Sequence, residues 1–159
     1  MNDNNFFGDS DLVFSPLGEY KTQEQLLKEF PYEFDGKNDF IQFYQIYNGI
    51  FFPDGAEICQ SRLPNHDRDD NEDFEIECFY DIGGRLEKMW EATKKMSKEA
   101  NVFAETHIPI ARDAAGNEFW IEIPSGFIKY VLWEYGLPDG EFLVAPSFRE
   151  FCFAIKSLN

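Results

Sequence analysis

The sequence predicts an α+β domain with a largely antiparallel sheet and helices packed around it. Strand-like segments crowd the second half of the chain, and short turns rich in Gly, Pro and Asn join them. A sustained alternation of strand and helix, which is typical of a parallel sheet, is not seen. Aromatic side chains make up 18% of the 159 residues, so the chain can bury a core despite its charge. We therefore expect an irregular lead-in over residues 1–20 and one domain over residues 21–159.

The first half should contain two helices followed by extended structure. Thr22 begins a capping-box pattern that predicts a short helix ending at Pro31. Apolar residues at helical spacing predict a second helix over residues 38–48. Extended structure should run over residues 50–58, with a turn at residues 53–55 that separates two strands.

The second half should begin with a helix and continue as hairpins. Apolar residues on one face predict a long amphipathic helix over residues 85–99. Strands are expected over residues 106–111, 118–123 and 127–134, because turn-forming residues separate these apolar runs. A second capping-box pattern at Ser147 predicts the closing helix.

An acidic stretch before and within one expected strand is the most informative local feature. Seven carboxylates stand against one arginine, and they belong to Asp67, Asp69, Asp70, Glu72, Asp73, Glu75 and Glu77. Residues 74–80 alternate apolar and acidic side chains, which predicts a half-buried strand with Glu75 and Glu77 facing water. The residues expected to be buried in this strand are Phe74, Ile76, Cys78 and Tyr80.

The charge distribution restricts the classes of partner. The chain has 30 acidic and 14 basic residues and a net charge of −16, of which −13 falls in residues 1–80. Phosphate contacts need Lys and Arg, so we expect no direct nucleic-acid binding, and an anionic membrane would repel this protein. A basic protein partner would explain the acidic stretch. The alternative is a solvated loop beside a solvated strand face.

The sequence has no set of residues at the spacing that a metal site, a cofactor site or an enzyme active site needs. His66 and His107 lie far apart, and the three cysteines form no CxxC pair. The acidic stretch does not match the EF-hand calcium-binding loop, because Glu72 replaces the required Gly and Cys78 replaces the bidentate Glu. The polar start lacks a signal peptide, so a cytoplasmic monomer is the default expectation.

Four segments, in this order, resemble the SUKH superfamily, which includes the Smi/Knr cell-wall regulators. They are a helix ending in Tyr-Asn-Gly (residues 40–49), a strand–turn–strand with Asp and Gly-Asn (107–118), a strand with an aromatic beside an acidic residue (129–134), and an Ala-x-Ser-Phe-x-Glu-Phe helix start (144–151). The resemblance implies an α+β fold. For bacterial members it implies an immunity protein that binds and neutralises a toxin domain, often a nuclease. A non-enzymatic scaffold with a housekeeping or regulatory partner is the alternative.

Two further groups of residues are candidates for special roles. The family-motif positions are Asn48, Gly49, Asp113, Gly116 and Asn117, and we expect them to act locally by ending a helix and forming a tight turn. Trp133 and Glu134 are candidates for partner contact, because Trp is enriched at interface hot spots. Core packing of Trp133 is the competing expectation.

Overall fold

The computed structural model describes residues 5–63 and 73–158. The helices are α1 (Gln23–Glu29), α2 (Lys37–Ile46), α3 (Arg85–Lys94), α4 (Lys98–Thr106) and α5 (Phe148–Phe153), with short 3₁₀ helices η1 (Gln60–Arg62) and η2 (Trp133–Tyr135). The strands are β1 (Ser15–Pro16), β2 (Ile50–Ile58), β3 (Phe74–Phe79), β4 (His107–Arg112), β5 (Glu118–Glu122), β6 (Ile128–Val131), β7 (Glu141–Ala145) and β8 (Ile155–Ser157). Within these ranges, none of the helices combines the length and apolar composition needed to cross a membrane.

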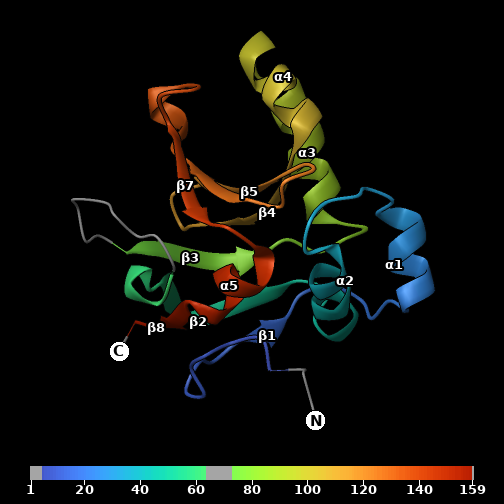
Figure 1. Cartoon of the computed structure of the whole chain (residues 1–159), viewed down its shortest axis with the longest axis vertical. Coiled ribbons are helices and arrows are strands. Elements are labelled where there is room, and N and C mark those ends of the chain that lie inside the picture. The colour runs from blue at the N-terminus through green and yellow to red at the C-terminus, as the bar shows by residue number, and fades with distance from the viewer. Residues whose placement is uncertain (1–4, 64–72, 159) are drawn as a thin grey trace.

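The strands form one sheet in the order β1-β2-β3-β4-β5-β6-β7, and β8 also pairs with β2 (Figure 1). Each of these pairings is antiparallel. The predicted α+β class with a largely antiparallel sheet is therefore confirmed. Neighbours in the sheet are mostly neighbours in sequence, as short connections favour.

The main core is aromatic and lies between the sheet and helices α2 and α5. Phe43 of α2 is fully buried, and its ring centroid lies 5.0 Å from that of Phe79 on β3 and 5.1 Å from that of Phe148 on α5. The lead-in contributes to this core, because Phe6 and Phe7 are buried and both of their rings contact that of Phe43. Edge-to-face contacts of this kind add to the free energy gained from burying the rings.

A second, smaller core lies where α3 and α4 pack beside β4 and β5 (Figure 1). Its buried members are Phe103, Ala104, Trp120 and Val131. Trp90 of α3 packs against it, and its indole N–H donates to the carbonyl of Ala104 at 2.9 Å. That bond connects α3 to α4.

The predicted helix over residues 85–99 is wrong, because the structure has two helices there. The Ser97 side chain accepts a hydrogen bond from the backbone N–H of Ala100 at 3.1 Å, and it begins α4 as an N-cap. Met96 was expected on the apolar face but lies in the break and is 57% exposed. The local N-cap therefore determines where α4 begins, although the apolar periodicity of the sequence continues across the break.

The predicted turn at residues 53–55 is also wrong, since β2 runs through it as one strand. The register jumps here: Phe51 is opposite Cys78, and the next pair is Ala56 opposite Ile76. Four residues of β2 therefore stand against one residue of β3, which is a large β-bulge. Further along, the predicted strand over residues 127–134 ends at Val131, where η2 follows.

Candidate functional site

The acidic strand is the part of the predicted site that the structure describes most fully. Ile76 and Cys78 of β3 are buried and Glu75 is exposed, as the alternation predicted. Phe74 is only half-buried, contrary to prediction, and its ring lies against Tyr130 with centroids 4.6 Å apart. The strand therefore presents its acidic side to solvent, while its first residue contributes to the rim of the core.

The second glutamate of the strand is half-buried, not fully exposed as predicted. A carboxylate oxygen of Glu77 lies 2.6 Å from Nη2 of Arg112, the last residue of β4. The register places Cys78 opposite Arg112, so the two side chains meet at the β3–β4 seam. This ion pair neutralises Glu77, whereas Glu75 forms no ion pair with the residues that the structure describes.

Glu75 has a like charge beside it. Its partner across the β2–β3 ladder is Glu57, and like charges directly opposite each other destabilise a sheet. Lys156 of β8 lies 3.4 Å from Glu57 and offsets one of the two charges. A cation from another molecule at this position would relieve the remaining repulsion.

The rest of the acidic stretch divides into two parts. Asp67, Asp69, Asp70 and Glu72 lie outside the residues that the structure describes. Asp73 is described, and its Oδ1 accepts a hydrogen bond from the backbone N–H of Gln60 at 2.9 Å. Asp73 therefore helps to hold η1, and it should be treated separately from its neighbours in charge-reversal experiments.

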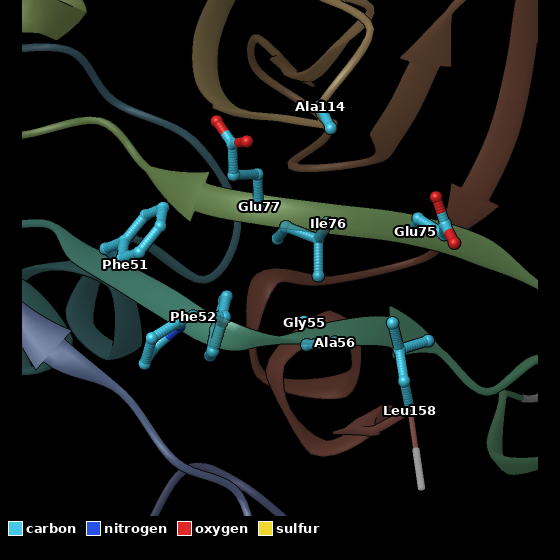
Figure 2. Close-up of a pocket in the computed structure, with 10 residues that line it drawn as sticks. Phe51, Phe52, Gly55, Ala56, Glu75, Ile76, Glu77, Ala114 and Leu158 are labelled. Carbon is cyan, nitrogen blue, oxygen red and sulfur yellow. The ribbon is translucent and has the colours of Figure 1, made fainter.

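A hollow of about 220 Å³ adjoins the two glutamates. Figure 2 shows Glu75 and Glu77 on one side of β3, toward Ala114 of the β4–β5 turn, and Ile76 on the other side. The hollow forms at the β2 bulge, where the strands are locally out of register. Its apolar lining comes from Phe51, Phe52, Pro53, Ala56, Ile76, Ala114 and Leu158, and Gly55 and the two glutamates complete it.

The bulge depends on one glycine. Gly55 has φ +83°, and a Cβ there would come within 2.4 Å of Cδ1 of Leu158. A side chain at this position would therefore be strained and would displace Leu158. The result is an apolar surface beside carboxylates, which suits a long cationic side chain with an aliphatic stem. Among the described residues, no cluster of His, Cys, Asp and Glu could hold a metal ion.

The model of the SMI1 / KNR4 family (SUKH-1) matches residues 24–153. The chain belongs to this family. The resemblance seen in the four motif segments is thereby confirmed. No solved structure matches this chain significantly.

One curated relative of this SUKH-1 chain is the SPbeta prophage-derived uncharacterized protein YokK of Bacillus subtilis (strain 168). The two are 35% identical over 83 residues. The match covers 50% of this chain and 41% of the relative. The similarity therefore concerns part of each protein.

The first pair of family-motif residues does more than end a helix. Asn48 is buried; its Nδ2 donates to the carbonyls of Glu19 and Ile82, and its Oδ1 accepts from the N–H of Ile82. Gly49 has φ +84°, and a Cβ there would lie 2.9–3.0 Å from Asp81 atoms. The local interpretation was incomplete, because Asn48 joins the end of α2 to the segment between β3 and α3.

The second group forms the tight turn that was expected. Oδ1 of Asp113 accepts from the N–H groups of Ala115 and Asn117 at 3.0 and 2.9 Å, and Gly116 has φ +90°. The group also has longer-range roles. Oδ2 of Asp113 accepts from the Tyr130 hydroxyl at 2.6 Å, and Oδ1 of Asn117 accepts from the N–H of Trp133 at 3.1 Å.

Trp133 is half-buried and Glu134 is exposed. The Trp133 indole N–H donates to Oε1 of Glu118 at 3.3 Å, and the Tyr80 hydroxyl donates to Oε2 at 2.6 Å. Burial raises the pKa of Glu118 to about 7, although these hydrogen bonds act in the opposite direction. The sequence pattern did not single out Glu118, although its position two residues before Trp120 places both side chains on the same face of β5.

Proposed function

We propose that this SUKH-1 protein is an immunity protein that binds and neutralises a toxin domain through the acidic side of β3. The observation that carries the proposal is the position of Glu75 and Glu77 on one side of the strand, beside an apolar hollow (Figure 2). Membership of the SUKH-1 family supports a binding role of this kind.

The charge of the chain favours a basic partner. A nuclease holds phosphates with a positively charged surface, and an inhibitor with a net charge of −16 is attracted to such a surface. Steering of this kind raises association rates by roughly 10- to 1,000-fold at low salt. We therefore propose a basic toxin domain, with a nuclease as the leading class.

Binding alone would block the toxin, so the protein would need neither a cofactor nor catalysis. A cytoplasmic location is part of the same proposal, and the three unpaired cysteines support it.

The test begins with the reading frame next to this gene. If it encodes a toxin domain, that domain should copurify with this protein, and co-expression should protect cells. Association rates would then be measured for Glu75→Lys and for Glu19→Lys. Glu19 is also exposed, so the two variants change net charge equally and differ in where the change lies.

We expect Glu75→Lys to slow association by roughly threefold to tenfold at low salt and Glu19→Lys by less than about twofold. The difference should shrink at roughly 1 M salt, where the screening length is about 3 Å. Equal rates for the two variants would contradict the proposed surface. A neighbouring frame without a toxin, together with a different copurifying protein, would favour a regulatory scaffold instead.

A further inference from the structure

A groove separate from the acidic strand lies between α4 and the segment from η2 to β7. It consists of adjoining hollows of about 480 and 330 Å³, and Glu99 and Leu137 line both of them. Figure 1 shows α4 and β7 rising on opposite sides of this region. The acidic hollow at the β2 bulge has different lining residues, so the two sites are distinct.

The walls of the groove are apolar and open to solvent. Val102 and Met96 are 56% and 57% exposed, and Leu137 is half-buried on the opposite wall. Phe103 is buried beneath them, and its ring stacks on that of His107 with centroids 3.8 Å apart. Aliphatic groups lining a concave surface favour an occupant with an apolar stem.

Next to the groove, the lining residues His107 and Glu141 contact Lys129, a cation whose hydrogen-bond donors are already saturated. The ammonium of Lys129 donates to Glu122 at 2.9 Å, to His107 Nε2 at 3.1 Å and to Glu141 at 3.4 Å. An ammonium has three donors, so Lys129 has no hydrogen left for an anionic ligand. Because Nε2 accepts, Nδ1 of His107 carries the proton and donates to the carbonyl of Phe103 at 2.9 Å.

The groove therefore has an excess of negative charge. Next to the groove, the two carboxylates of Glu122 and Glu141 face the one ammonium of Lys129, and His107 is neutral, since burial lowers its pKa to about 4. Glu99 lines both hollows and forms no ion pair within the described ranges. Besides Glu141, the segment over residues 132–141 contains two further acidic residues, Glu134 and Asp139, and no Lys or Arg. Lys98, at the start of α4, is the one Lys or Arg among the described residues that line the two hollows.

We propose that this groove is a second contact surface for the protein partner and that it receives an arginine or lysine side chain. The stem of that side chain packs on Val102, Phe103 and Leu137, and its charge lies toward Glu99 and Glu141. Cationic side chains with buried methylene stems are suited to such a surface. The identity of the partner as a toxin rests on the proposed function; the preference of the groove for a cation does not.

The first experiment needs no toxin. N-acetyl-arginine amide would be titrated into the full-length protein while backbone amide shifts are followed by NMR, with N-acetyl-citrulline amide as the uncharged match. We expect saturable shifts over residues 96–103 and 133–141, and affinity at least severalfold weaker for citrulline. Shifts spread evenly over all acidic segments, no shifts at all, or equal responses to the two probes would overturn the proposed cation preference.

Matched variants then separate the groove from general charge effects. Val102→Arg should block the groove and abolish the arginine shifts, whereas Asn101→Arg, on the same helix but outside the lining, should change the affinity by less than about twofold. Glu99→Gln should weaken binding of the probe, and Glu105→Gln should not. Equal effects within either pair would contradict the assignment.

The final experiment uses the copurified toxin domain. Val102→Arg should reduce its affinity by roughly tenfold or more, a loss of about 1.4 kcal/mol, while Asn101→Arg retains it. If the arginine probe binds the groove but both variants bind toxin equally, the groove takes a cation and is not a partner contact. If no toxin partner exists, the probe titration still decides the cation preference by itself.

Discussion

The two helical layers that pack on the sheet differ in how they are held. The layer of α2 and α5 is built from interlocked aromatic rings, such as Phe43 between Phe79 and Phe148. The layer of α3 and α4 packs over a smaller cluster, whose buried members are Phe103, Ala104, Trp120 and Val131, and ionisable groups lie beside it. The comparison indicates that the first layer supplies most of the stability, whereas the second holds the charged groups and the open groove.

The largest effect on the free energy of unfolding is expected in the aromatic layer. Phe43→Ala should lower the free energy of unfolding by roughly 3–5 kcal/mol, because it removes a fully buried ring from close packing. Phe103→Ala in the second layer should cost less, since fewer buried side chains surround it. Urea unfolding of both variants would measure this, with Phe153→Ala, 52% exposed on α5, as the control. Equal losses at positions 43 and 103 would remove the distinction between the layers.

The second prediction concerns the junction between the two layers. Asn48→Ala would leave the N–H and carbonyl of Ile82 and the carbonyl of Glu19 without their partner. An unpaired buried polar group costs roughly 1–3 kcal/mol, so we expect a loss of about 3 kcal/mol in unfolding free energy. Asn101→Ala, at an exposed position of α4, should have little effect. A loss below about 1 kcal/mol at Asn48 would mean that water replaces its bonds.

The third prediction uses the buried carboxyl of the second layer. The unfolded chain loses the Glu118 proton near pKa 4.5, whereas the folded protein holds it until about 7. The folded state therefore binds more protons between these values, and the free energy of unfolding falls as pH rises through that window. The total is roughly 3 kcal/mol at about 1.4 kcal/mol per pKa unit.

Glu118→Gln should remove this slope, because a neutral amide can still accept from the Trp133 indole and donate to the Tyr80 hydroxyl. Chemical unfolding at pH 5, 6, 7 and 8 would compare the variant with the parent protein. The difference between them should grow in favour of the variant up to pH 7 and then remain constant. A constant difference at every pH would show that Glu118 titrates normally.

The smallest expected effect concerns the acidic strand. Glu75→Lys should raise the free energy of unfolding by a few tenths of a kcal/mol, because it replaces a like-charge pair with Glu57 by an opposite pair. Thermal unfolding with and without roughly 1 M salt, where screening is nearly complete, would measure it. A loss of stability above about 1 kcal/mol would mean that Glu75 makes a structural contact.

Local patterns in the sequence predicted those parts of the fold that depend on neighbouring residues. The capping box at Thr22 and Gln25 is present, with both reciprocal hydrogen bonds. The period-two pattern placed Ile76 and Cys78 inside and Glu75 outside. The four motif segments were sufficient to identify the family.

The features that the sequence did not predict depend on alignment between distant segments. The hollow beside β3 exists because β2 and β3 shift register around Gly55, and no single segment encodes that shift. The groove requires the break between α3 and α4. There Ser97 begins α4 as its N-cap, although the apolar pattern of the sequence continues across the break. The strand β8, which follows α5 closely, has only three residues, and so short a segment gives no periodic signal.

The polar cluster around Lys129 has a further consequence, for how the strands find their alignment during folding. Its members come from four successive strands: His107 from β4, Glu122 from β5, Lys129 from β6 and Glu141 from β7. A slip of one residue in any of these strands would turn its member to the opposite face of the sheet. The ammonium would then lose a partner while partly buried, at a cost that apolar packing alone does not impose. Lys129 therefore favours the native register of these four strands over registers that are shifted by one residue.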